Sequence, residues 1–308
     1  MSDSPGEITR KVREFYERCH FPGDRPLDHD GLILTRWFAK SAAALDRGAG
    51  APARVLDAGC GTGNTSVALA RQYPAIQFLG IDHSLSSLAQ AEERARHSGL
   101  RNLSFHHGDL MHPLAAGRFD IILCLGVLHH TADMRRVLAN LCACLNPSGH
   151  LYLWVYGRHG RYRHSLNMRL LAMLTGPAAA PDEALSLAGE FAFPTGGESP
   201  LDDLLGRNRL DPNHRQTFRD PVWIADQFLH PHETPVDLEE LLQLIAACGL
   251  KLQRQFDIRE DLASYFPSAP LRERFLKLSP RDRLIALALL LKPERYFVLL
   301  RRGPAPEE

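Results

Sequence analysis

From residue 54 onward, short runs of apolar residues alternate with segments whose apolar positions recur every three or four residues. A short apolar run between turns predicts a buried strand, and the longer period predicts an amphipathic helix. Such alternation predicts an α/β fold with a doubly wound, mostly parallel sheet that helices cover on both faces. We expect seven strands, at residues 54–57, 77–81, 103–106, 119–125, 150–156, 250–258 and 296–300.

Several helices between these strands have recognisable ends. Ser84 is expected to cap the helix after the second strand, and Thr131 the helix after the fourth. Residues 146–149, Asn-Pro-Ser-Gly, are expected to end that later helix. Asp237 and Glu240 have the spacing of a capping box, which predicts a helix start where the alternation resumes.

The alternation is preceded by one helical segment and interrupted twice. Two amphipathic helices precede the first strand, and the regular pattern stops between Gly157 and Thr234. Insertions of this size are uncommon unless they are functional or disordered. We therefore divide the chain into an N-terminal helical lid (1–50), an α/β core (51–157), an insertion that caps the functional site (158–233), the remainder of the core with a second helical insert at 259–292 (234–302), and a tail (303–308).

The composition of the chain argues against some classes of binding partner and indicates the cellular compartment. Lys plus Arg (36) balances Asp plus Glu (36), so the whole chain has no basic field for nucleic acid or a membrane, although a local patch is compatible with this balance. The apolar run at 284–291 is far shorter than the roughly 20 residues that cross a bilayer. The N-terminus lacks a secretory apolar run, and the six cysteines contain no CxxC pair, which predicts reduced thiols and a cytoplasmic protein.

The sharpest local signal is the segment VLDAGCGTGN at residues 55–64. Gly59, Gly61 and Gly63 allow the backbone to turn sharply and to approach a ligand without a Cβ in the way. A dinucleotide fingerprint is GxGxxG, whereas the spacing here is GxGxG. The loop therefore predicts a ligand other than NAD or FAD, and Asp57 just before it favours one that carries an ammonium group.

Acidic residues end three consecutive predicted strands, at Asp57, Asp82 and Asp109. The carboxyl ends of the strands in an open α/β sheet form the edge at which ligands bind. Asp82 could accept hydrogen bonds from both hydroxyls of a ribose, and Asp109 could accept one from the exocyclic amine of a base. Each acid alone is also typical of a turn or a helix cap. Together with the glycine loop, the three predict a nucleoside-sized site.

These segments resemble the class I S-adenosylmethionine-dependent methyltransferases, and among them the methyltransferase type 11/12-like group. Residues 55–64 are similar to the glycine loop of that family, 80–84 to its ribose-binding loop and 108–110 to its adenine-binding loop. Residues 119–130 and 145–151 are similar to its fourth-strand motif and to the turn before its fifth strand. The resemblance implies a Rossmann-like fold, S-adenosyl-L-methionine as cofactor and S-adenosyl-L-homocysteine as product. It covers residues 52–157, 234–258 and 295–301.

The resemblance also implies roles for the matching residues. Asp82 would hold the ribose hydroxyls, and Asp109, with the Leu110 backbone beside it, would bind the adenine amine. The backbone carbonyls of Gly59 and Leu125 would accept hydrogen bonds from the methionine ammonium. Asp57 would order the glycine loop, and further cofactor contacts are expected from Gly61, Gly63, His83 and Tyr16 of the lid.

The implied reaction is an in-line displacement at the sulfonium methyl by an oxygen, nitrogen or carbon nucleophile. Alignment of the reactants supplies up to about 7–11 kcal/mol of the acceleration, and a general base matters only when the nucleophile arrives protonated. His129 and His130 follow the fourth strand, at the edge that the acceptor must approach, so either is a candidate base. The alternative is that this histidine pair is not catalytic.

The insertion supplies candidate acceptor contacts. Arg161 and Tyr162 belong to the basic run 158–164, which would recognise an acidic or phosphorylated acceptor or else form a solvated arm. Residues 226–233 gather His230 and His232 with two acids, an arrangement that also occurs in zinc or iron sites. Pro231 argues against helical ligand spacing, so we favour an acceptor pocket or a plain loop and expect no metal. Aromatic walls are expected from Tyr162, Phe218, Trp223 and Phe228.

We therefore expect an S-adenosylmethionine-dependent methyltransferase that acts on a small-molecule acceptor. The chain lacks, after its fourth strand, the Asn/Asp-Pro-Pro-Tyr/Phe and Pro-Cys signatures of nucleic-acid base methylation. A tRNA or protein methyltransferase is one alternative, and a cofactor-binding subunit without catalysis is another. The aromatic residues of the insertion would serve equally well in a homodimer interface.

Overall fold

The computed structural model describes residues 3–23, 29–44, 52–176, 179–192, 220–258, 265–266 and 268–302. Within these ranges the chain forms a seven-stranded sheet in the order β3-β2-β1-β4-β5-β7-β6. The strands β1 to β5 pair in parallel, and β7 lies antiparallel between β5 and β6. The predicted doubly wound, mostly parallel sheet is confirmed.

The strands are β1 (Arg54–Ala58), β2 (Gln77–Asp82), β3 (Leu103–His107), β4 (Phe119–Leu125), β5 (Leu145–Tyr156), β6 (Leu250–Gln255) and β7 (Arg295–Arg302). The helices before and within the first half of the sheet are α1 (Pro5–Tyr16), α2 (His29–Ala44), α3 (Asn64–Gln72), α4 (Leu85–His97), the 3-10 turn η1 (Leu128–His130) and α5 (Met134–Cys144). The later helices are α6 (Arg158–Thr175), α7 (Pro181–Ala192), α10 (Pro221–Phe228), α11 (Leu238–Ala247), α13 (Ala269–Leu276) and α14 (Pro280–Leu291).

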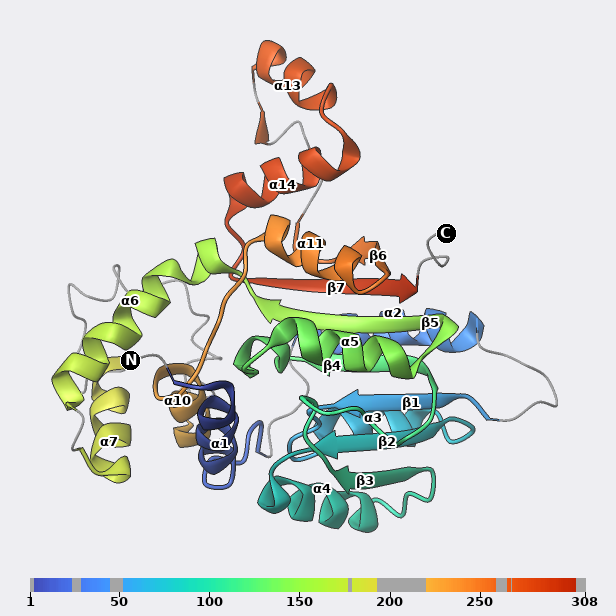
Figure 1. The fold of residues 1–308 in the computed structure, drawn as a ribbon, viewed down its shortest axis with the longest axis vertical. Helices are drawn as coiled ribbons and strands as arrows, with labels where there is room; N and C mark the ends of the chain where they lie inside the picture. Colours follow the sequence, from blue (N-terminus) through green and yellow to red (C-terminus); the bar gives the residue numbers. More distant parts are fainter. Residues whose placement is uncertain are drawn as a thin grey trace.

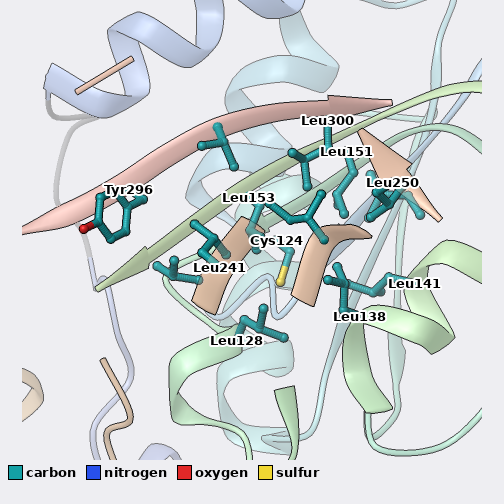
Figure 2. Packing of buried hydrophobic residues seen from close by; sticks show 14 of the residues in the cluster. Cys124, Leu128, Leu138, Leu141, Leu151, Leu153, Leu241, Leu250, Tyr296 and Leu300 are labelled. Carbon is teal, nitrogen blue, oxygen red and sulfur yellow. The ribbon is translucent and has the colours of Figure 1, made fainter. Parts of the chain in front are cut away.

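Alternate residues of the central strands face two separate hydrophobic layers, as their pleat requires. Leu56 and Ile122 face the layer built by α5, α11 and α14, whose packing Figure 2 shows. Val55 and Ile121 face the opposite layer, where Phe38 of α2 and residues of α3 cover the sheet. Burial on both faces explains why these strands appear as continuous apolar runs in the sequence.

The helices α1, α6, α7 and α10 lie beyond the carboxyl ends of the parallel strands, on the side to which their arrowheads point (Figure 1). A small core of their own joins three of them, because Leu171 of α6, Ala188 of α7 and Ile224 of α10 pack together. The described part of the insertion therefore stands at the edge of the sheet where an α/β fold binds its ligands. No helix in the described ranges is long and apolar enough to cross a membrane.

Two predicted helix starts are confirmed. The Ser84 hydroxyl accepts a hydrogen bond from Ser87 N–H at 3.1 Å at the start of α4. Asp237 and Glu240 form a complete capping box at the start of α11.

The predicted limits of the helix after β4 are wrong at both ends. Asp133 caps α5, whereas the Thr131 hydroxyl donates to the Leu128 carbonyl and remains in the preceding turn. Residues 146–149 lie within β5, because the buried Leu145 already pairs with Phe119 of β4 before the register shifts. The sequence cannot show this early pairing, since it depends on a neighbouring strand.

The basic run is helical from its first residue and is not an irregular arm, although Tyr162 and Arg163 are exposed. The helix α6 starts at Arg158, whose N–H donates to the Val236 carbonyl at 2.8 Å. Gly157 N–H donates to the Glu294 carbonyl, also at 2.8 Å. These two bonds anchor the helix start to the core.

Candidate functional site

The loop between β1 and α3 contains three glycines with positive φ. Gly59, Gly61 and Gly63 have φ values of 80°, 50° and 77°, which residues with a side chain rarely adopt. A Cβ on Gly59 would lie 2.4 Å from Val127 Cγ2, and one on Gly61 would lie 2.5 Å from the Phe21 carbonyl oxygen. The sequence predicts that these glycines make room for a ligand. In the structure they also admit the loop after β4 and the N-terminal segment.

The N-terminal segment is hydrogen-bonded to this glycine loop. Thr62 N–H donates to the Phe21 carbonyl at 3.4 Å, and the Thr62 hydroxyl donates to the Gly23 carbonyl at 3.3 Å. Asn64 Nδ2 and Arg94 Nη2 donate to the same Gly23 carbonyl, at 3.0 and 3.2 Å. The segment after α1 therefore lies directly against the loop that follows β1.

Asp82, at the end of β2, is buried, and its carboxylate organises the backbone on both sides. Oδ2 accepts a hydrogen bond from Gly61 N–H, and Oδ1 accepts one from Ser84 N–H, each at 2.9 Å. A carboxylate has about four acceptor positions, so two remain for further donors. Asp82 thus links the glycine loop to the start of α4 and still has acceptor capacity for a ribose.

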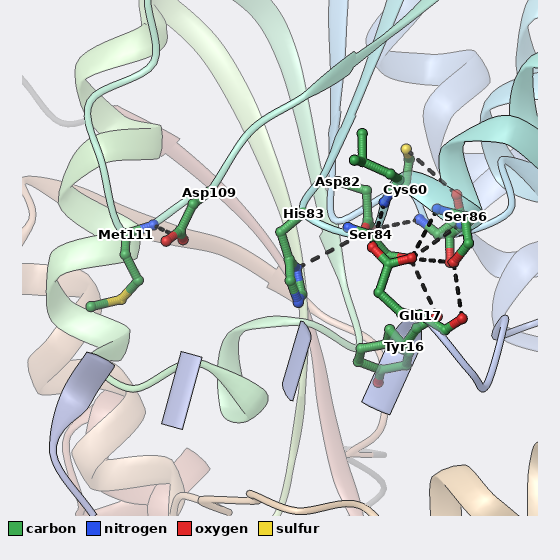
Figure 3. A network of polar contacts seen from close by, with 12 residues as sticks. Tyr16, Glu17, Cys60, Asp82, His83, Ser84, Ser86, Asp109 and Met111 are labelled. Carbon is green, nitrogen blue, oxygen red and sulfur yellow. Dashed lines mark hydrogen bonds and ion pairs between the residues drawn. The ribbon is translucent and has the colours of Figure 1, made fainter. Parts of the chain in front are cut away.

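Glu17, which the sequence does not single out, ties the N-terminal segment to α4 (Figure 3). Its carboxylate oxygens accept hydrogen bonds from Leu85 N–H at 2.8 Å and from Ser86 N–H at 3.1 Å. Hydrogen bonds from Ser86 and Leu85 lower the pKa of Glu17. An anion at the exposed N–H groups of a helix start is stabilising. No local pattern reveals this contact, because the partners are 68 and 69 residues apart.

Asp57 bridges the two ends of the glycine loop. Its Oδ2 accepts a hydrogen bond from the Ser66 hydroxyl of α3 at 2.5 Å. Burial, with a smaller contribution from the nearby Asp82 charge, raises the pKa of Asp57 to about 6. A cationic ligand beside this carboxylate would stabilise its ionised form.

The other predicted cofactor residues lie along the same edge. Asp109 Oδ1 accepts a hydrogen bond from Met111 N–H at 2.8 Å, and Figure 3 places Asp109 to one side of the network around Asp82. Leu110 is buried in the core, and Leu125 ends β4 opposite Trp154 of β5.

Histidines from two distant segments form a buried cluster near the ends of β4 and β5. The ring centroids of His130 and His230 are 3.7 Å apart, and those of His129 and Tyr156 are 4.1 Å apart. Nδ1 of His130 lies 2.9 Å from the His232 carbonyl oxygen. The structure thus brings together both candidate bases and two candidate acceptor contacts.

Burial keeps these imidazoles neutral. It lowers the pKa of His130 to about 3, and it lowers those of His129 and His230 well below their usual range. Neither ring nitrogen of His129, nor Nε2 of His230, has a hydrogen-bond partner among the residues that the structure describes. An unpaired buried polar atom costs about 1–3 kcal/mol. A ligand that hydrogen-bonds to these nitrogens would remove that cost.

Tyr16 joins the histidine cluster from α1. Its hydroxyl donates to Asp226 Oδ1 at 3.1 Å, and its ring centroid lies 5.4 Å from that of His230 and 6.3 Å from that of His83. Burial raises the pKa of Asp226 to about 6. Tyr16 therefore stands between His83, which follows Asp82, and the histidine cluster.

Arg161 is committed to contacts within the protein. Its guanidinium forms two hydrogen bonds to the Glu233 carboxylate, at 2.9 and 2.8 Å, and a third to Gln227 Oε1 at 3.1 Å. It also stacks over the Tyr156 ring, with Cζ 3.5 Å from the centroid. Arg161 acts here as a structural bridge between α6 and the residues after α10.

The remaining predicted acceptor contacts are dispersed. Tyr162 is exposed on the outward face of α6, and Trp223 packs beside Phe228 in the small core of the insertion. Phe218 lies outside the described residues. Neighbouring residues of one helix point in different directions, so adjacency in the basic run does not place Arg161 and Tyr162 in one site.

The structure gives no support to the metal interpretations. In the described ranges, no group of three or more His, Cys, Asp or Glu side chains could hold a metal ion. Cys142 and Cys144 stand two residues apart on α5, but their thiols donate to the carbonyls of different residues, Cys248 and Leu114.

Four polar residues around the histidines belong to no clear sequence motif and are not predicted as site residues. Gln227 Nε2 donates to the Tyr156 hydroxyl at 2.9 Å and to Asp226 Oδ2 at 3.0 Å, and Glu233 completes the group through Arg161. Asp226 and Glu233 could be found from the density of His and acidic residues at 226–233. Tyr156 looks like an ordinary strand residue.

A glycine loop after β1, acids at the ends of β1 and β2 and after β3, and a sheet whose last strand is antiparallel define the class I methyltransferase fold. Residues 50–167 match a family described as a methyltransferase domain. PKMT2 from Rickettsia typhi, solved in complex with AdoHcy, has the same fold, with a TM-score of 0.64 at 18% identity. The match covers 82% of this chain and 49% of that protein, so this chain spans about half its length.

Two curated relatives extend the comparison. An uncharacterized protein of Synechococcus sp. is 32% identical over 314 residues, which cover 98% of this chain and 74% of that protein. The trans-aconitate 2-methyltransferase of Deinococcus radiodurans is 36% identical over 168 residues, which cover 53% of this chain and 59% of the relative. Residues 50–167 therefore belong to a methyltransferase domain family, and the chain has the class I methyltransferase fold.

Proposed function

We propose that this protein transfers a methyl group from S-adenosyl-L-methionine to an oxygen, nitrogen or carbon nucleophile of a small molecule. One observation carries the proposal. The glycine loop with Asp82 is joined through Tyr16 and His83 to a buried cluster whose imidazole nitrogens lack partners among the described residues. A methyl transfer needs its two substrates side by side. The glycine loop and Asp82 would hold the cofactor, and the histidine cluster would hold the acceptor beside it.

The described residues fit the cofactor in charge and hydrogen bonding. Asp82 has acceptor capacity for the ribose, and Asp109 follows β3, where the adenine would lie. Asp57, whose raised pKa reports an uncompensated buried carboxylate, suits a cationic ligand. When bound, the sulfonium of the cofactor supplies an electrophilic methyl group.

In this proposal His129 accepts the proton that the nucleophile releases. Its ring is neutral and both its nitrogens lack partners among the described residues, so one of them can take a proton. His130 is less suited, because its Nδ1 is held by the His232 carbonyl. The low basicity of a buried imidazole favours an acceptor whose own proton is acidic.

The N-terminal segment serves in this proposal as a lid over the cofactor. Residues 21–23 are bonded to the glycine loop, Glu17 is bonded to α4, and Tyr16 is bonded to α10. Closing the site excludes water and fixes the acceptor. The six cysteines are free, which agrees with the cytoplasmic location that we propose.

A small acceptor is supported by the enclosure of the histidine cluster and by one relative. The histidine cluster is enclosed by side chains of α1, α6 and α10, which suits a compact molecule. Trans-aconitate, in the name of the Deinococcus relative, is a small molecule. We propose that this chain also acts on a small acceptor.

The test is incubation of the protein with methyl-labelled S-adenosylmethionine and fractionated cell extract, followed by location of the label. Label in a low-molecular-weight fraction is the expected result. Label in RNA or protein would identify the tRNA or protein methyltransferase instead. Cofactor binding without transfer to any fraction would favour the non-catalytic subunit.

A further inference from the structure

The outward face of α6 carries a continuous apolar stripe. Tyr162, Leu166, Leu170 and Met173 are 62%, 47%, 45% and 74% exposed. At about 100° per residue, these four side chains fall within an arc of about 80° around the helix axis. We call them the α6 stripe. Large apolar side chains gathered on one exposed face usually mark a contact surface.

Arginines border the α6 stripe on both sides. By the same helical geometry, Arg169 lies about 20° beyond one edge of the arc and Arg163 about 20° beyond the other. Both arginines are exposed. The sequence from Arg158 to Ala180 contains no Asp or Glu, although the whole chain is neutral. Positive charge therefore borders the α6 stripe on both sides.

The opposite face of α6 is fixed to the rest of the insertion. Leu171 packs against α7 and α10, and Arg161 forms its ion pair with Glu233 there. Because that face is occupied, the helix cannot rotate to bury the α6 stripe without losing these contacts. The stripe is thus held in an outward orientation, on the other side of the helix from the histidine cluster.

We propose that the α6 stripe docks the protein on an anionic lipid surface. A helix with an apolar face bordered by arginines is typical of helices that lie in the plane of a membrane interface. The apolar side chains enter the boundary of the acyl chains, and Arg163 and Arg169 meet the lipid phosphates. The neutral overall charge predicts no membrane partner, but charge averaged over the chain does not describe this one face. The proposal does not depend on catalysis.

Vesicle binding tests the proposal with the full-length chain. We expect the protein to sediment with vesicles of equimolar phosphatidylcholine and phosphatidylglycerol, and to bind pure phosphatidylcholine more weakly. Arg169→Gln should weaken binding about fivefold, since an arginine near an anionic surface contributes about 1 kcal/mol. The double variant Leu166→Asn/Met173→Asn should weaken binding by roughly tenfold or more.

A matched control separates this surface from general stickiness. Leu271 and Leu276 of α13 are 56% and 51% exposed, so the double variant Leu271→Asn/Leu276→Asn removes a comparable amount of exposed apolar surface elsewhere. It should bind the mixed vesicles as the parent does. Absence of vesicle binding by the parent, or equal losses in both double variants, would overturn the proposal. A dimer that only Leu166→Asn/Met173→Asn dissociates, without vesicle binding, would assign the stripe to a contact between two copies.

Discussion

At the scale of single residues, the site combines carboxylates that need a cation with imidazoles that need a hydrogen-bond partner. Asp57 is buried with its pKa raised to about 6, and His129 is buried with two unpartnered nitrogens among the described residues. Both features are unfavourable in the protein alone. Bound ligands would remove both costs: a cationic cofactor would balance the Asp57 carboxylate, and a protic acceptor would hydrogen-bond to His129.

His129 allows the most direct test of the chemistry. Replacing His129 with Gln should reduce turnover by about 10²–10⁴-fold, the range of a lost general base, and leave cofactor affinity unchanged. Calorimetry with S-adenosylmethionine and a turnover assay separate these effects. His97→Gln is the control, because this exposed histidine at the end of α4 lies outside the cluster. Equal turnover of His129→Gln and the parent would show that His129 has no catalytic role.

The raised pKa of Asp57 predicts a pH dependence of stability. A carboxyl with a folded-state pKa near 6 and an ordinary value of 3.8 binds its proton more tightly when folded. Its contribution is fully present below the ordinary pKa and is lost as the pH rises through about 6. The loss amounts to roughly 3 kcal/mol for two pKa units.

Urea unfolding of the parent and of Asp57→Asn, at a pH below 4 and near 7, measures this contribution. The free energy of unfolding of the parent should fall relative to that of the variant as the pH rises, because other titrating groups are common to both. A constant difference between the two proteins would contradict the raised pKa.

At the scale of elements, the sequence predicts what depends on local pattern. The central strands follow from apolar runs, and Ser84 and Asp237 mark helix starts through their own side chains. The early start of β5 at Leu145 depends on pairing with Phe119, and the start of α6 is anchored by bonds to Val236 and Glu294. These partners are distant in sequence, so no local pattern contains them.

Some residues of the candidate site could likewise be predicted from local pattern, and others could not. Asp57, Asp82 and the histidine pair His129 and His130 follow strand ends or belong to motifs, so they could be found from the sequence. Glu17 and Tyr156 could not, because their roles arise only when α1 meets α4 and when α6 meets β5. The ion pair of Arg161 with Glu233 could not be found from the sequence either, because the two residues are 72 positions apart.

The proposed role of the N-terminal segment as a lid predicts an effect of replacing Glu17, which follows α1. Replacing Glu17 with Gln removes a charge from two N–H groups at the start of α4, which should lower the free energy of unfolding by about 1 kcal/mol. Cofactor affinity should also fall, because the N-terminal segment would no longer be held on the glycine loop. Chemical unfolding and calorimetry measure the two effects.

A matched control lies one helical turn away. Glu14 is half exposed and pairs only with Arg10 in the described contacts, so Glu14→Gln changes the same charge without touching α4. It should behave as the parent does. If Glu17→Gln leaves both stability and affinity unchanged, α1 is an ordinary covering helix and not a lid.

At the scale of the whole molecule, separate parts of the chain meet at one edge of the sheet. The order β3-β2-β1-β4-β5-β7-β6 places the ends of β1, β2 and β4 side by side, with α1 and α10 beyond them (Figure 1). The glycine loop, the N-terminal segment and the end of the insertion therefore form one continuous site. In the proposed function, the sheet supplies the glycine loop and the acids, and the insertion and α1 control what reaches the cofactor.

The central claim is that this edge binds S-adenosylmethionine, and calorimetry with S-adenosylmethionine and NAD tests it most directly. We predict binding of S-adenosylmethionine and no binding of NAD. Asp82→Ala should weaken the affinity by about tenfold or more, since a hydrogen bond to a charged group contributes about 1.5–3 kcal/mol. Asp133→Ala, which removes a helix cap outside the site, should retain the affinity of the parent. Binding of NAD without binding of S-adenosylmethionine would contradict the account.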